Sequence, residues 1–127
     1  MTINVISGAI VDAAIQIHRD LGPGLLESVY EAVLAFELQQ RGLSLQRQVA
    51  IPIKYRSLEI ADAFRADWIV NRQVIIELKS VEQVAPVHKK QRLTYLRLTN
   101  MQVGLLLNFG CEVMRSGIHR VANNAPN

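Results

Sequence analysis

The chain has 127 residues, half of them hydrophobic, which is enough for one domain with a core and excludes an intrinsically disordered chain. Cys111 is the only cysteine, which excludes an internal disulfide and a cysteine-based zinc site and fits a reducing cytoplasm. The formal net charge of +3 is compatible with a polyanionic partner. Because no apolar run approaches the roughly 20 residues that span a membrane, we expect a cytoplasmic protein without a membrane partner.

The first predicted helix covers residues 3–21, where apolar residues recur at helical spacing. Gly22-Pro23-Gly24 then ends the helix. His18 lies near its C-terminus, and we expect a surface histidine that is favoured by the helix dipole.

A second helix is predicted from about Leu25 to Arg41. Glu27 and Glu31 are four residues apart and therefore share a face near its start. Acids in a first helical turn are common for dipole reasons alone. No lysine or arginine at neighbouring spacings relieves the repulsion between these two, so a metal-binding or catalytic role is the alternative.

Three strands are predicted next. Residues 45–55 indicate a strand of the edge type, because Pro52 removes a donor from the hydrogen-bond ladder and therefore favours an edge or a bulge. Residues 59–70 and 73–80 indicate two strands joined at Asn71-Arg72. Their nearly continuous apolar runs are typical of a sheet that is covered on both faces.

Polar residues interrupt the second and third of these strands. Glu77 and Lys79 point the same way because side chains alternate along a strand, and the hairpin would bring Asp67 alongside them. Hard cations such as Mg²⁺ prefer oxygen ligands of this kind, and a lysine beside them can orient a water or neutralise phosphate charge. The spacing fits at least as well a simple ion pair between Lys79 and either carboxylate.

A third helix is predicted over residues 86–99, with Pro86 in its first turn. We expect it to pack beside the strand that carries Glu77. His88, Gln91 and Tyr95 fall within an arc of roughly 60° on this helix, so one ligand can contact Gln91 and Tyr95 together. The alternatives without ligand binding are a partly buried tyrosine at Tyr95 and a solvated face for the basic residues Lys89, Lys90, Arg92 and Arg97.

The C-terminal part is predicted to contain an interior strand over residues 101–109 and a short hairpin over 112–121 that turns at Ser116-Gly117. Residues 122–127 are expected to form a frayed tail. The element order predicts one domain over 1–127, of the α/β class, with helices flanking a mixed sheet.

Two motifs in this order resemble a known family. Asp67, followed by Glu77-Leu78-Lys79, resembles the motif of the PD-(D/E)XK nuclease superfamily, although Ala66 stands where the proline of its name would be. Gln91 and Tyr95 resemble the Q-x-x-x-Y motif of its RecB-type branch.

Residues 24–30 match the G-x-x-E-x-x-Y signature of the small bacterial GxxExxY proteins of this superfamily, and residues 105–110 are also similar. The resemblance covers roughly residues 5–121. Glu27 is the acid of the signature. Glu31 matches no position in it and stays a reserve candidate.

The resemblance implies an αβββαβ core and hydrolysis of phosphodiester bonds that depends on Mg²⁺ or Mn²⁺. Asp67 and Glu77 would be metal ligands, Glu27 a further acid, and the carbonyl group of Leu78 a further ligand. Lys79 would be the catalytic lysine, which stabilises the transition state or acts as the base.

The resemblance also implies a nucleic-acid partner, with DNA as the first choice and little sequence specificity. It implies that Gln91 and Tyr95 support either the DNA phosphate or the lysine. The neighbouring basic residues Lys89, Lys90 and Arg92 would hold the nucleic-acid backbone by charge, with His88 as a further binding or supporting candidate. A non-catalytic binding module that kept the fold is the main alternative, and a plain structural domain is the third. The sequence leaves open DNA or RNA, endo- or exonuclease action, and a monomer or homodimer.

Overall fold

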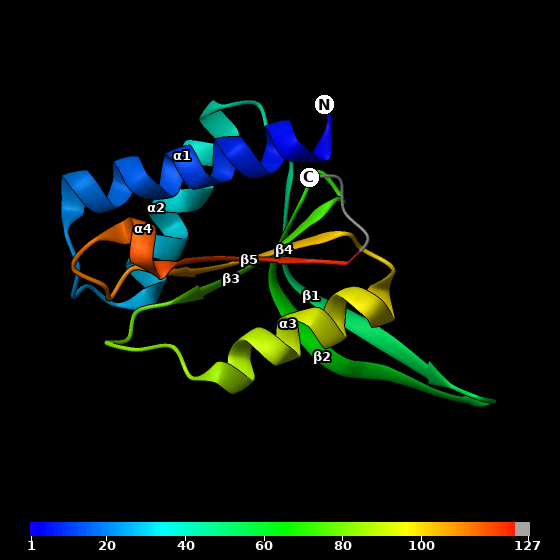
Figure 1. Cartoon of the computed structure of the whole chain (residues 1–127). Coiled ribbons are helices and arrows are strands. Elements are labelled where there is room, and N and C mark those ends of the chain that lie inside the picture. Colours follow the sequence, from blue (N-terminus) through cyan, green and yellow to red (C-terminus); the bar gives the residue numbers. More distant parts are fainter. Residues whose placement is uncertain (124–127) are drawn as a thin grey trace.

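A computed structural model describes residues 1–123, except for the side chains of Lys89 and Arg92 (Figure 1). Its helices and strands follow the order expected from the sequence. They are α1 (Ile3–Leu21), α2 (Glu27–Gln40), β1 (Leu45–Tyr55), β2 (Leu58–Val70), β3 (Val74–Lys79), α3 (Pro86–Thr99), β4 (Val103–Asn108), α4 (Met114–Gly117) and β5 (Ile118–Ala122).

The five strands form one mixed sheet in the order β1-β2-β3-β4-β5. β3 and β4 run parallel, and the other neighbouring pairs run antiparallel. The parallel pair is joined through α3, as a crossover connection requires. The predicted α/β fold with a mixed sheet is confirmed, with β1 at an edge and β4 in the interior.

Helices cover both faces of the sheet, as the apolar strands predicted. α1 and α2 lie on one face and α3 lies on the other (Figure 1). Trp68 and Leu78 face α1 and α2 in the larger buried cluster, whereas Ile69 and Ile75 meet Leu96 of α3 in a second cluster. Neighbouring residues of one strand therefore belong to different cores.

Helix α3 lies mainly over β4 and β5, so the expected place beside the strand of Glu77 is wrong. The reason is local: Gly104 of β4 has no side chain, and Leu96 of α3 packs over it. Leu96 still reaches Ile75 of β3 in the shared cluster.

The predicted C-terminal hairpin over residues 112–121 is also wrong. Met114–Gly117 form the short α4, and β5 pairs with β4. Gly117 packs so closely on the backbone of Asn108 that any side chain there would clash. Ala122, expected in the tail, pairs with Val103 as the last residue of β5, and residues 124–127 lie outside the described part.

His18 is buried, which contradicts its expected surface position. Its Nε2 atom lies 2.7 Å from the carbonyl oxygen of Cys111, so this histidine joins the end of α1 to the loop after β4. Within the described residues, no helix is long and apolar enough to cross a membrane.

Candidate active site

The hairpin between β2 and β3 positions the central acidic pair. Asn71 and Arg72 have φ values of 48° and 57°, the paired positive angles of a tight type I′ turn. The register that follows pairs Trp68 with Ile76. One residue farther from the turn than this pair, Asp67 precedes Trp68 on β2 and Glu77 follows Ile76 on β3. The two acids therefore lie next to each other on adjacent strands.

Asp67 lies where β2 loses its regular pairing. The β1–β2 register omits Asp67 and Gln48, and Gln48 has a positive φ of 48°. Instead of a ladder bond between the backbones of β2 and β3, the N–H group of Leu78 donates to Oδ2 of Asp67 at 3.1 Å. This hydrogen bond fixes the Asp67 carboxylate against the backbone between Glu77 and Lys79.

Glu77 and Lys79 share one face of β3 and are both half-buried, while Leu78 points into the core on the other face. Only the backbone of Leu78 is therefore available to a site on the Glu77 face. None of the ion pairs found among the described residues involves Lys79. This observation disfavours the alternative in which Lys79 only forms a strand-end ion pair.

Glu27 lies at the end of the same strand. It is the first residue of α2, and its Oε1 atom accepts a 3.2 Å hydrogen bond from the N–H group of Ser80. Ser80 also donates its hydroxyl to the carbonyl of Leu25 at 2.7 Å. The loop that begins α2 is thus attached to the residue that follows Lys79.

Glu31 is placed differently. Its Oε1 atom pairs with Arg47 of β1 at 3.1 Å, and the guanidinium of Arg47 lies 4.8 Å from the ring centre of Trp68. Sequence spacing did not show this partner, because Arg47 lies on another element. Of the two acids, Glu27 is therefore the one beside the motif strand.

The donor set fits a small hard cation. Mg²⁺ is held in many sites by one or two carboxylates with water and phosphate completing its shell, and Asp67 with Glu77 supplies two. Within the described residues, no three His, Cys, Asp or Glu side chains gather as a ready-made metal cluster. A role for Glu27 as a third ligand remains a prediction.

The predicted binding residues of α3 lie in varied surroundings. Tyr95 stacks on Phe64 of β2, with ring centres 3.7 Å apart and planes at 8°. Gln91 and Lys90 are exposed. His88 is half-buried, and its Nδ1 atom has no hydrogen-bond partner among the described residues. The side chains predicted at positions 89 and 92, Lys89 and Arg92, lie outside the described part.

Asn108 is a structural residue of the site that the sequence analysis did not single out. It ends β4, is fully buried, and forms two hydrogen bonds with the backbone of Val81, accepting at 3.0 Å and donating at 2.9 Å. Its Oδ1 atom also accepts from the N–H group of Gly110. The available signal was a lone amide at the end of an apolar strand, since a buried amide needs partners.

Tyr30 explains the end of the G-x-x-E-x-x-Y pattern. Its buried ring stacks on Phe109 at 4.5 Å, and its hydroxyl donates to the carbonyl of Gly22 and accepts from the N–H group of Leu25. Tyr30 therefore holds the loop that leads into Glu27 against the end of β4.

This fold and these motifs define a class of protein. Residues 4–121 match the sequence model of the PD-(D/E)XK nuclease superfamily, and the chain belongs to that superfamily. Membership supports a nuclease-like function. No curated protein and no solved structure matches the chain significantly. The narrower assignments to the GxxExxY proteins and the RecB-type branch remain predictions.

Proposed function

We propose that this chain is a cytoplasmic nuclease that hydrolyses phosphodiester bonds with a divalent metal ion, with DNA as its substrate and little sequence specificity. The observation that carries the proposal is the hydrogen bond from Leu78 to Asp67. It holds one carboxylate beside Glu77 and Lys79 in a chain of the PD-(D/E)XK superfamily.

The metal would be held by Asp67 and Glu77, with the Leu78 carbonyl and Glu27 as further candidates. When bound, Mg²⁺ or Mn²⁺ supplies a polarised phosphoryl oxygen and a more acidic water. Lys79 has a compact ammonium on the same face as Glu77 and would stabilise the charge that develops on the phosphate. The N–H group of Leu78 orients the Asp67 carboxylate for this role.

Helix α3 would bind the nucleic-acid backbone through the exposed Gln91 and Lys90, with Lys89, Arg92 and His88 as neighbouring candidates. Tyr95 is held on Phe64 and would support this surface. Contacts of this kind are made to phosphate groups, so affinity should depend on salt and only weakly on sequence.

We expect the purified protein to cleave end-labelled DNA when Mg²⁺ or Mn²⁺ is present, and Asp67→Ala to abolish cleavage. The alanine removes both the candidate ligand and the acceptor for Leu78. A titration of both metals with single- and double-stranded DNA and RNA measures this and identifies the substrate. Asp12→Ala, which removes an exposed acid from α1, is the matched control and should cleave normally.

Wild-type protein that binds nucleic acid but cleaves none of these substrates with either metal would contradict the proposal. That result would favour a non-catalytic binding module.

We expect millimolar Mn²⁺ to raise the melting temperature of the wild-type protein, because the cation relieves repulsion between Asp67 and Glu77. At ten times the dissociation constant the stabilisation is about 1.4 kcal/mol, or about 5 °C. Asp67→Asn keeps an acceptor for Leu78 but removes the charge of the candidate ligand, so it should lose the shift. Differential scanning calorimetry of both proteins tests this, and an equal shift in both would refute the site.

A further inference from the structure

The ends of β1 and β2 form a two-stranded extension beyond the body of the molecule (Figure 1). We define residues 52–63 as the arm. Within it Ile53 pairs with Ile60, and Tyr55 pairs with Leu58. Directly paired residues, and alternate residues of one strand, lie on the same face of a ribbon. One face of the arm therefore carries these four apolar side chains.

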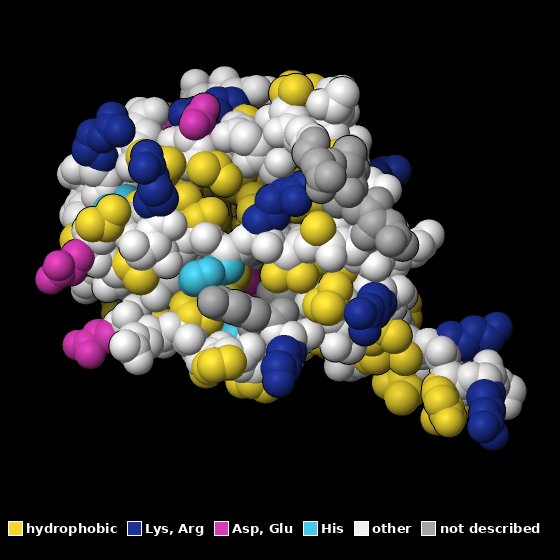
Figure 2. All heavy atoms as spheres, in the orientation of Figure 1, with side chains coloured by type: hydrophobic (Ala, Val, Ile, Leu, Met, Phe, Trp, Pro, Cys, Tyr) yellow, Lys and Arg dark blue, Asp and Glu magenta, His cyan; other side chains and the backbone are white. Residues whose placement is uncertain are grey.

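This apolar face is open to solvent. The relative exposures of Tyr55, Leu58 and Ile60 are 64%, 57% and 46%. Figure 2 shows hydrophobic side chains along the projecting arm, with basic groups near its far end. A contiguous apolar surface on a projecting element is typical of a protein contact, because water is released when a partner covers it.

The apolar surface continues from the arm onto α3. A groove of about 530 Å³ is lined by Pro52, Ile53, Ile60 and Leu98, among others. Leu98 lies in the last turns of α3 and is 45% exposed. The base of the arm thus offers a recess whose lining is mostly apolar and includes Lys54 and Glu59, and its tip offers the protruding side chains of Tyr55 and Leu58.

The charge of the arm favours protein over nucleic acid as its partner. Lys54 and Arg56 are balanced by Glu59 and Asp62, so residues 52–63 have no net charge, and the whole +3 lies elsewhere in the chain. Lys54 is also paired directly with Glu59 across the two strands. A phosphate-binding arm would carry an excess of basic groups. A neutral arm instead allows two copies of a basic protein to meet without repulsion.

We propose that the arm is a dimerisation element whose partner is a second copy of this chain. The two arms lie antiparallel with their apolar faces together, and Tyr55 and Leu58 of each copy cover Leu98 and the recess of the other. Such an arrangement is two-fold symmetric and closed, so the apolar arm face and the recess of both copies are covered in one dimer. The two arms pack face to face and do not extend each other's sheets edge to edge, because Pro52 lacks the N–H group that pairing along the β1 edge would need.

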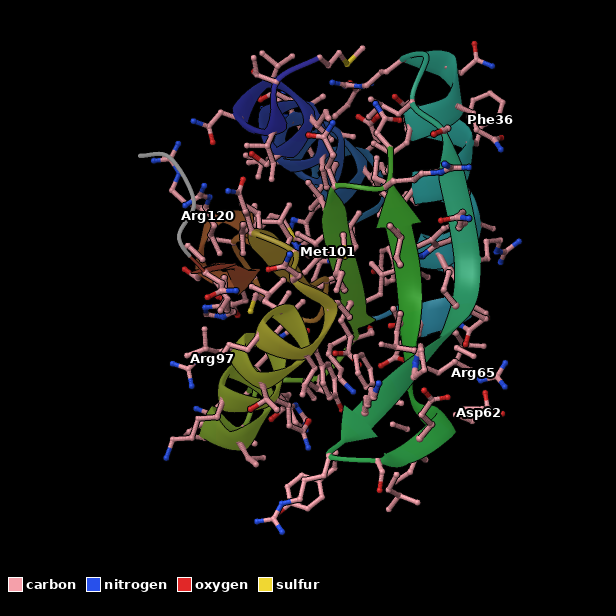
Figure 3. The ribbon with its side chains drawn as sticks, turned by 90° about the vertical axis from the view of Figure 1, so that its right-hand side faces the viewer. Phe36, Asp62, Arg65, Arg97, Met101 and Arg120 are labelled. Carbon is pink, nitrogen blue, oxygen red and sulfur yellow. The ribbon has the colours of Figure 1, made fainter. Side chains whose placement is uncertain are left out.

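Sedimentation velocity of the full chain over a range of concentrations tests the dimer. We expect a dimer for the wild type and a monomer for the double variant Tyr55→Ser/Leu58→Ser, which should fold normally because both side chains are exposed. Phe36→Ser is the matched control. Phe36 is 60% exposed and points outward from α2 (Figure 3), so its loss should leave the dimer intact.

Cross-linking tests the predicted contact itself. Tyr55→Cys/Cys111→Ser is mixed with Leu98→Cys/Cys111→Ser, and mild oxidation should link the two different chains by a disulfide. Phe36→Cys/Cys111→Ser in place of the first protein should give no such product. The proposal is overturned by a monomeric wild type, by a double variant that remains dimeric, or by the absence of the mixed disulfide. Loss of nucleic-acid binding in the double variant without any change in oligomeric state would also overturn it, and would assign the arm to nucleic acid.

Discussion

Lys79→Ala should lower the single-turnover rate of nucleic-acid cleavage by roughly 10²- to 10³-fold, the usual cost of removing one group that stabilises transition-state charge. Lys79 is half-buried on the same face of β3 as Glu77. The Asp67 carboxylate accepts a hydrogen bond from the N–H group of Leu78, which lies between them. Because the lysine would act on the transition state, metal and nucleic-acid binding should largely survive its loss. Rapid-quench cleavage with excess enzyme, beside equilibrium binding of the same oligonucleotide, measures both effects.

Two further lysine variants sharpen this experiment. Lys79→Arg keeps the charge but replaces a compact ammonium with a planar fork, so it should also cleave slowly. Lys90→Ala removes an exposed charge from α3 and should weaken binding and flatten its salt dependence, while the chemical step stays at the wild-type rate. Unchanged single-turnover cleavage by Lys79→Ala would remove the lysine from the mechanism.

The central hairpin could be predicted because its determinants are local. Strand alternation relates Glu77 to Lys79, and Asn71-Arg72 provides a turn residue at the point where two apolar runs meet. The turn fixes the register, and the register places Asp67 beside Glu77. Each step depends on residues that are close in sequence, so no knowledge of tertiary packing was required.

The supporting contacts could not be predicted because they join distant parts of the chain. Glu31 meets Arg47, Tyr95 stacks on Phe64, and His18 reaches the backbone of the loop after β4. Each pairing depends on how helices dock on the sheet, which periodicity does not specify. The Ser116-Gly117 turn signal failed for the same reason, since the glycine there serves close packing on Asn108.

The sequence motifs converge on one structural unit at the end of β3. Glu27 accepts from Ser80, and Tyr30 of the same signature stacks on Phe109. Asn108 binds the backbone of Val81 on the other side of this loop. The loop after Lys79 is therefore held from α2 and from β4 together. We infer that this unit sets the position at which β3 presents Lys79.

Gly110→Ala should destabilise the protein by about 2 to 4 kcal/mol, because a methyl group at position 110 has no space. Its Cβ would lie 2.6 Å from the backbone nitrogen of Val81, and backbone atoms cannot rotate away as a side chain would. The estimate combines the usual cost of overpacking, about 1 to 3 kcal/mol, with about 1 kcal/mol for weakened hydrogen bonds between Asn108 and Val81. Thermal unfolding should show a fall of roughly 8 to 16 °C.

Gly8→Ala is the matched control for this substitution. Gly8 is exposed on α1, and nothing lies within 4 Å of the position that its Cβ would occupy. Alanine should therefore stabilise the helix by about 0.5 to 1 kcal/mol, the opposite sign from Gly110→Ala. If the loop also positions Lys79, folded Gly110→Ala protein should cleave more slowly than Gly8→Ala at a temperature where both are native. Equal melting temperatures for Gly110→Ala and the wild type would contradict this prediction. They would show that the loop after Lys79 can shift to accommodate the methyl group without loss of stability, and that Asn108 does not fix its position.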